Sequence, residues 1–133
     1  MKSRDTLIRL KRFQVDEKRR RVAQIEMMIA EFDRMAADLD REIAAEEQKA
    51  GITDPNHFAY PTYARAAAQR RDNLRMSAQN LHKQLDDAKA ELGEAFEELK
   101  RAESLEDRER GSERTLDPSI SQMGQARAIR ATA

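Results

Sequence analysis

The sequence predicts an all-α fold: a long antiparallel two-helix coiled-coil hairpin with a flexible C-terminal tail. Three observations predict it, namely the composition, a heptad repeat in two segments, and charge blocks of alternating sign. The chain has 133 residues, of which 38% are charged and 5% aromatic, with four Gly, three Pro and no Cys. A composition this rich in helix formers and poor in core residues is typical of a coiled coil rather than of a compact globule.

Charged residues form four blocks along the chain. Residues 1–21 carry a net charge of +6 and residues 22–50 a net charge of −5, while 61–83 carry +4 and 84–110 carry −5. If helices over 1–50 and 61–110 pack antiparallel, each basic block lies beside an acidic one. Parallel packing would place like charges together, so the pattern favours an antiparallel hairpin over residues 1–110.

The first expected helix, residues 1–50, repeats apolar residues at alternating spacings of three and four. Position a of the heptad is aliphatic throughout, whereas position d holds lysine near the N-terminus. The a positions are Ile8, Val15, Val22, Ile29, Ala36 and Ile43, and the d positions are Lys11, Lys18, Ile25, Phe32, Leu39 and Glu46.

The second expected helix, residues 61–110, shows the same repeat with smaller side chains. Its d positions are Ala67, Leu74, Leu81, Ala88, Ala95 and Ala102, and its a positions are Arg71, Ala78, Leu85, Leu92 and Leu99. Pairing residues whose numbers sum to 110 brings position a of one helix against position d of the other, with large side chains facing small ones in several layers.

The midpoint of this register is Pro55, and proline cannot continue a helix. We therefore expect a turn at about residues 51–60. Beyond the hairpin, Gly111, Asp117-Pro118 and Gly124 punctuate residues 111–133, which we expect to form a low-complexity, mostly disordered tail.

No constellation typical of catalysis is present, so we expect no enzyme activity and no cofactor. His57 and His82 have no Cys or His partners at metal-ligand spacing, so we expect no metal site. No apolar run approaches the roughly 18 residues that span a membrane, and no secretory signal opens the sequence. With the lack of Cys, these features favour a cytoplasmic protein.

The densest charge run is Lys18, Arg19, Arg20 and Arg21. One interpretation makes it the basic partner of the acidic run from Glu91 to Glu98, which the register places alongside. A second makes it an exposed ring of cations for an acidic protein surface. A third, a phosphate clamp for nucleic acid, is disfavoured by the zero net charge of the chain.

Half of the chain's aromatic and imidazole side chains gather beside the turn, at His57, Phe58, Tyr60 and Tyr63. In one interpretation Phe58 and Tyr60 pack down to close the hairpin tip, and Tyr63 is the first interior residue of the second helix. In the other, some of them are exposed anchors for a partner, since aromatic residues concentrate binding energy at interfaces.

Three segments of the chain resemble the FliJ family of flagellar export proteins in its alphaproteobacterial form. They are the opening MKSRDTLIRLKRF, the QVDEKRR that follows, and FAYPTY at residues 58–63. The resemblance covers residues 1–110 and not the tail. The insert with Pro55 and Pro61 departs from members that have a longer unbroken helix.

The resemblance implies a non-enzymatic stalk of the flagellar type III export apparatus, similar to the central shaft of rotary ATPases. Its partners would be the flagellar export ATPase, the cytoplasmic domain of the export gate and export chaperones, with no nucleic acid. Such a protein would be cytoplasmic and peripheral at the cytoplasmic face of the inner membrane, through its partners only.

The resemblance also implies partner-binding residues at both ends of the hairpin. The expected ATPase contacts are Ile8, Lys11, Lys18, Arg19, Arg20 and Arg21, and the expected gate contacts are Phe58, Tyr60 and Tyr63. The alternative functions are a nucleic-acid-associated coiled coil and a purely structural coiled-coil adaptor, for example a homodimer in which the same heptads pair between chains.

Overall fold

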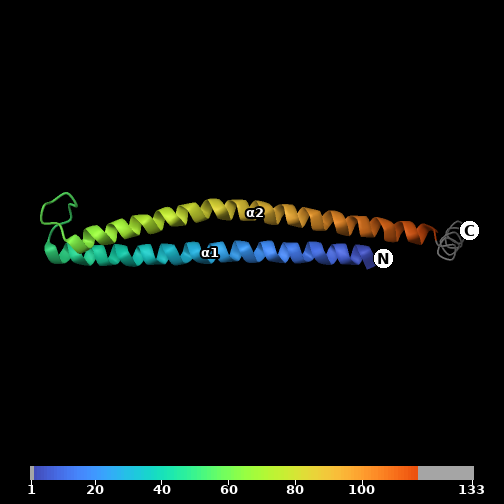
Figure 1. Ribbon diagram of the computed structural model, residues 1–133, viewed down its shortest axis with the longest axis horizontal. Coiled ribbons are helices and arrows are strands. Elements are labelled where there is room, and N and C mark those ends of the chain that lie inside the picture. Colours follow the sequence, from blue (N-terminus) through green and yellow to red (C-terminus); the bar gives the residue numbers. More distant parts are fainter. Residues whose placement is uncertain (1, 117–133) are drawn as a thin grey trace, which may run out of the picture. The chain divides into compact units, whose positions relative to one another are not determined.

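The computed structural model describes residues 2–116, and the side chains of residues 3–112. It contains two helices, α1 (Lys2–Ala50) and α2 (Thr62–Leu116), and the described residues include no strand. Figure 1 shows α1 leading into the loop and α2 returning from it in the opposite direction. The all-α two-helix hairpin is therefore confirmed.

Helix α2 continues to Leu116, past residue 110, where the hairpin was expected to end. Gly111 lies within this helix and does not have a positive φ. A single glycine costs a helix only about 1 kcal/mol relative to alanine, which is too little to end a helix between Glu109-Arg110 and Ser112-Glu113-Arg114. The rest of the expected tail, residues 117–133, lies outside the described residues.

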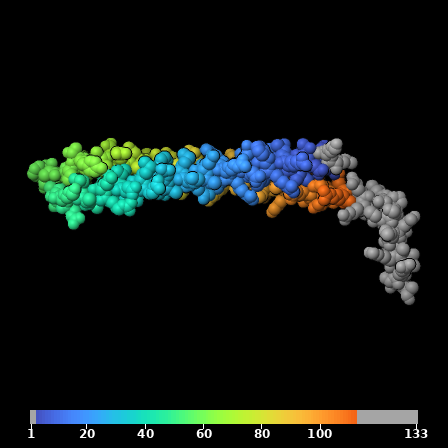
Figure 2. Space-filling model, turned by 90° about the horizontal axis from the view of Figure 1, so that it is seen from below, coloured from blue at the N-terminus to red at the C-terminus, as the bar shows by residue number. Residues whose placement is uncertain are grey.

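The chain forms two compact units. The terminal unit comprises residues 1–17 and 92–133, of which the structure describes 2–17 and 92–116, and the turn unit comprises residues 18–91. Each unit contains a stretch of α1 beside a stretch of α2. Figure 2 shows this for the terminal unit, where the start of α1 in blue lies against the end of α2 in orange.

The buried side chains of both units occupy a and d positions of the heptad, which we call the seam, and all but Tyr60 and Ala64 were among the expected positions. In the terminal unit they are Ile8, Val15, Ala95 and Ala102. In the turn unit they are Val22, Ile25, Ile29, Ala36, Leu39, Ile43, Tyr60, Ala64, Ala67, Ala78, Leu81, Leu85 and Ala88. No polar or charged residue is buried among the described residues, so one apolar stripe per helix holds each unit together.

Ion pairs between the helices of the turn unit agree with the expected register. Lys18 was expected opposite Leu92, and its Nζ lies 2.9 Å from Oε2 of the preceding residue, Glu91. Asp40 pairs with Arg71 at 2.9 Å, one residue from its expected opposite number. Partner numbers fall along α2 as they rise along α1, so the helices of this unit are antiparallel.

The terminal unit shows the same direction of pairing. Lys11 Nζ lies 2.9 Å from Glu98 Oε2, and Arg4 pairs with Glu109. The hydrogen bond from Lys11 lowers the pKa of Glu98. These pairs join the basic block 1–21 to the acidic block 84–110, as the charge pattern predicts.

Backbone hydrogen bonds fix the loop between the helices. Gly51 has φ +70°, a conformation that favours glycine, and its N–H donates to Glu47 O at 2.8 Å to cap α1. Asp54 Oδ1 accepts from Asn56 N at 2.9 Å, and His57 Nδ1 accepts from Ala59 N at 3.0 Å. At the start of α2, Pro61 O accepts from Arg65 N at 3.1 Å.

We predict that Ile25→Ala lowers the free energy of unfolding by about 2–5 kcal/mol, because Ile25 is only 1% exposed and its removal leaves a cavity in the seam. Urea unfolding followed by circular dichroism measures this change. Met27→Ala, two residues away and 72% exposed, is the matched control and should change stability by less than about 0.5 kcal/mol. Equal effects of the two variants would contradict the assignment of the seam.

Candidate partner-binding surfaces

Two of the expected ATPase contacts, Ile8 and Lys11, are engaged within the terminal unit. Ile8 is buried in the seam, so its side chain reaches no partner while the helices are paired. The Lys11 ammonium is held by Glu98. Both residues therefore stabilise the unit that would dock, and neither offers a free side chain to a partner.

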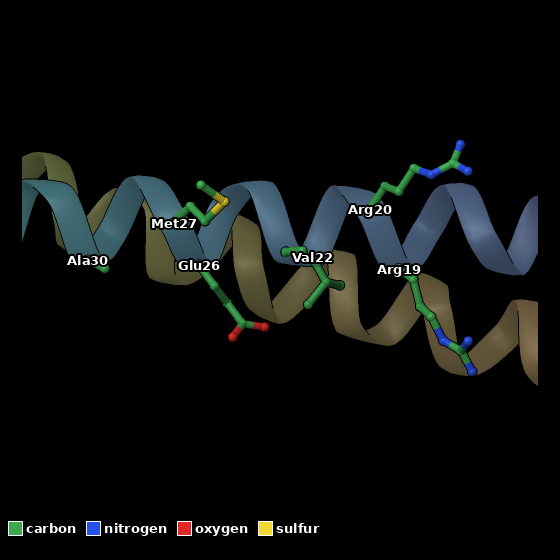
Figure 3. A pocket seen from close by; sticks show the side chains of 7 residues that line it. Arg19, Arg20, Val22, Glu26, Met27 and Ala30 are labelled. Atoms are coloured by element: carbon green, nitrogen blue, oxygen red, sulfur yellow. The ribbon is translucent and has the colours of Figure 1, made fainter.

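The basic run 18–21 divides into cations with different surroundings. Lys18 pairs with Glu91, which supports its interpretation as the partner of the acidic run. Arg19, Arg20 and Arg21 are exposed, and within residues 2–116 the structure gives no ion pair to Arg20 or Arg21. Figure 3 shows the Arg19 and Arg20 side chains leaving α1 on different sides.

A shallow, open groove lies beside this basic run on the surface of α1. The groove forms because two alanines leave space between larger side chains, and its surface is mostly apolar. It is lined by Arg19, Arg20, Val22, Ala23, Glu26, Met27 and Ala30. The heptad analysis did not predict this groove. It could have been inferred from the small residues Ala23 and Ala30, which lie seven residues apart and therefore on one outward face of the helix.

The terminal unit exposes an apolar patch that the sequence analysis also missed. Leu7, Leu10 and Phe13 of α1 are between 42% and 53% exposed, and Leu105 of α2 is 54% exposed. Leu105 follows Glu98 by one heptad, so it lies on the side of the seam where Lys11 and Glu98 pair. These residues lie outside the a and d positions. An apolar residue at such a position is expected to be exposed, and this could have indicated the patch from the sequence.

At the turn, the structure separates the three expected gate contacts. Tyr60 is only 6% exposed and packs with Leu39, Ile43, Ala64 and Ala67. Its hydroxyl donates to Glu47 Oε1 at 2.9 Å, and the Arg65 guanidinium lies 5.6 Å from the ring centroid. Tyr60 therefore closes the turn end of the seam, as one interpretation predicted.

Phe58 and Tyr63 do not pack as that interpretation predicted. Phe58 is 96% exposed, and its ring stacks on His57 at 4.7 Å between centroids. Tyr63 is 54% exposed and is not an interior residue, because the seam runs through Tyr60 and Ala64. The Tyr63 hydroxyl donates to Glu42 Oε2 at 2.7 Å. Phe58 and Tyr63 are thus available to a partner, and Tyr60 is not.

A second groove, in the terminal unit, is lined mainly by charged side chains from both helices, and its Arg12 lies 3.7 Å from Glu103. Residues 2–116 contain no group of three or more His, Cys, Asp or Glu side chains that could hold a metal ion. Neither helix, within the same residues, combines the length and the apolar character that crossing a membrane requires.

Comparisons with protein-family models, with curated proteins and with solved structures give no match to this chain.

We predict that both tyrosines titrate above their ordinary pKa of about 10. Burial and the hydrogen bond to Glu47 raise the pKa of Tyr60, and the hydrogen bond to Glu42 raises that of Tyr63. Since the chain has two Tyr and no Trp, tyrosinate absorbance reports them directly, and Tyr63→Phe isolates Tyr60.

The raised pKa of Tyr60 makes the stability of the fold depend on pH in a defined direction. Because folding raises the Tyr60 pKa, its contribution to stability is fully present below pH 10 and is lost as the pH rises through the folded value. Tyr60→Phe should therefore show a weaker loss of stability above pH 10 than the unaltered chain. A Tyr60 titration midpoint at or below 10 in the folded protein would contradict the burial described above.

Proposed function

We propose that this chain is a non-enzymatic stalk of the flagellar type III export apparatus. Its terminal end would dock into the ring of the export ATPase, its turn would contact the cytoplasmic domain of the export gate, and it would also bind export chaperones. It would act in the cytoplasm, peripheral to the inner membrane through these partners, and support export of flagellar subunits. The resemblance of residues 1–20 and 58–63 to the FliJ family supports this identity.

The observation that carries the proposal is the apolar patch of the terminal unit. Leu7, Leu10 and Phe13 remain exposed because they lie outside the a and d positions through which the helices of that unit pack. Exposed apolar residues that gather on one surface and have charged neighbours mark a protein interaction site. A partner that covered the patch would stabilise the paired helices by mass action.

The basic run adds charge to the proposed ATPase contact. Arg20 and Arg21 supply exposed cations suited to an acidic protein surface, whereas Ile8, Lys11 and Lys18 would act by holding the helices together. The Lys18 pairing also disfavours the phosphate clamp, since it removes one of the four cations from the surface such a clamp would use.

The gate contact would rest mainly on Phe58. Its side chain is 96% exposed, and the loop that carries it is fixed by backbone hydrogen bonds on both sides, from His57 N to Asp54 O and from Tyr60 N to His57 O. An aromatic anchor on an ordered loop binds with a small loss of conformational entropy. Tyr63 would contribute from the first turn of α2.

We predict that Leu10→Ser with Phe13→Ser weakens binding to the export ATPase by at least about tenfold, because truncating two hot-spot side chains typically costs more than 1.4 kcal/mol. Isothermal titration with the purified ATPase measures the affinity. Met76→Ser, which also removes an exposed apolar side chain but lies on α2 in the turn unit, should bind normally. Unchanged affinity of the double variant would refute the docking surface.

At the other end, we predict that Phe58→Ser weakens binding to the gate domain and leaves the melting temperature unchanged. Tyr60→Ala should lower the melting temperature, because it opens a cavity beside Leu39 and Ile43. Pull-down of the gate domain and thermal unfolding of each variant separate the two effects. A Phe58 variant that melts early but still binds the gate domain would reverse the roles assigned here.

A further inference from the structure

Two heptad columns run side by side on one surface of the turn unit, which we call the g face. The α1 column holds Arg21, Met28, Met35 and Glu42, and the α2 column holds Arg70, Ser77, Gln84 and Glu91. Tyr63 precedes Arg70 by one heptad, and its hydroxyl reaches Glu42 at 2.7 Å. At the opposite end of the face, Glu91 receives Lys18 at 2.9 Å. These two contacts place both columns on the same side of the seam.

The middle of the g face carries no charge. Met28 and Met35 are 45% and 37% exposed, and Ser77 and Gln84 opposite them are exposed as well. The nearest seam residue, Phe32, is only partly buried. In a chain that is 38% charged, a patch of methionine and uncharged polar side chains has the composition of an interface core, which is enriched in Met and depleted of charge.

The other side of the same unit is built differently. There the Asp40 carboxylate lies 2.9 Å from Arg71 and 2.5 Å from Arg75, so charges of the two helices neutralise one another within the chain. In the layers of Met28 and Met35 this other side carries the charged residues Glu26 and Asp33, whereas the g face carries none. The difference between the two sides argues that the g face is suited to a partner rather than to solvent.

Charge along the g face is arranged so that the face complements itself. Each column begins with Arg and ends with Glu, and within residues 2–116 the structure gives no ion pair to Arg21 or Arg70. If a column lies against a reversed copy of itself, its Arg end therefore meets the Glu end of that copy. An interface between identical chains related by a two-fold axis requires this property.

We propose that the g face binds a second copy of this chain, with the two copies related by a two-fold axis perpendicular to the helices. Each α1 then lies antiparallel to α1 of the second copy, with Met28 facing Met35 and Arg21 facing Glu42. On α2, Arg70 faces Glu91, and Ser77 faces Gln84. The product is a four-helix bundle around the turn unit, in which the methionines form the new core.

A single axis can serve both helices. The centre of the α1 column falls between Met28 and Met35, at residues 31–32, which the register places opposite residues 78–79 of α2. The centre of the α2 column falls at residues 80–81, about two residues away, or about 3 Å at the helical rise. Side chains as long as arginine and glutamate span such an offset. This coincidence of centres favours a second copy over an unrelated helix, which would not need it.

Sedimentation equilibrium of the full chain tests the proposal. A reversible dimer is expected, and Met28→Glu with Met35→Glu should weaken it at least about tenfold, because burying four carboxylates in the bundle opposes association. Met76→Glu makes the same change on an exposed methionine of α2 outside the face and should leave the dimer intact. A chain that stays monomeric at high concentration, or a dimer insensitive to both methionine changes, overturns the proposal.

A charge reversal tests the pairing itself. Arg21→Glu and Glu42→Arg should each weaken the dimer, and the two changes combined in one chain should restore it, since each copy then supplies both reversed partners. Circular dichroism should show helical single variants, which separates loss of the dimer from loss of fold. Failure of the double variant to recover would exclude this antiparallel arrangement.

The lack of cysteine in the chain permits a direct test of orientation. A mixture of Met28→Cys and Met35→Cys chains should form disulfide-linked heterodimers, because a disulfide requires Cα atoms within about 7 Å. Either variant alone should crosslink much less. A Met28→Cys chain that crosslinks to itself as fast as it does to the Met35→Cys chain would indicate a parallel pair and contradict the two-fold axis proposed here.

Discussion

The structure depends on the burial of one narrow apolar stripe per helix against its counterpart. Val22, Ile25 and Ile29 are buried on α1, and small residues such as Ala78 and Ala88 on α2 leave room for them. Such a stripe determines which faces of the helices meet, but by itself it would allow parallel as well as antiparallel packing. The charge blocks supply the direction, because only the antiparallel arrangement places the basic residues of each helix near the acidic residues of the other. Lys11 and Lys18 show how the two effects combine: their aliphatic stems lie at seam positions while their ammonium groups reach Glu98 and Glu91.

The apolar stripe and the antiparallel direction could be predicted from the sequence, because heptad phase and charge belong to each helix separately. The hairpin only brings the two helices together. The turn was equally predictable, since Pro55 excludes a helix and Gly51 supplies the positive φ that ends α1. The extent of α2 was not predicted, because a glycine such as Gly111 is common just after a helix but costs too little to end one by itself. The exposure of apolar residues outside the a and d positions, such as Leu10 and Phe13, was not predicted, because the heptad repeat identifies only the residues that pack inside.

The aromatic residues at the turn show why residue type alone does not assign a role. Tyr60 lies one heptad before Ala67 and therefore continues the seam across Pro61, although it precedes α2. Phe58 and Tyr63 have the same chemistry but lie out of phase with the seam, and both are exposed. Heptad phase extended through the loop would have distinguished them, whereas residue type, and the family resemblance that implied all three as gate contacts, could not. The loop geometry that makes Phe58 accessible depends on hydrogen bonds of Asp54 and His57 that no periodic pattern encodes.

A two-helix fold has no second layer to cover its outer faces, so the positions beside the seam decide what the molecule can bind. In the turn unit, one side uses Asp40 with Arg71 and Arg75 to satisfy charge within the chain. The other side carries methionine and uncharged polar residues between an arginine and a glutamate on each helix. Flexible, polarisable methionine tolerates several packing partners, so this face can bind a second copy without the rigid complementarity that the seam requires. The contrast follows from the seam itself: because the a and d positions already hold the helices together, the flanking positions are not constrained by folding and can specify association instead.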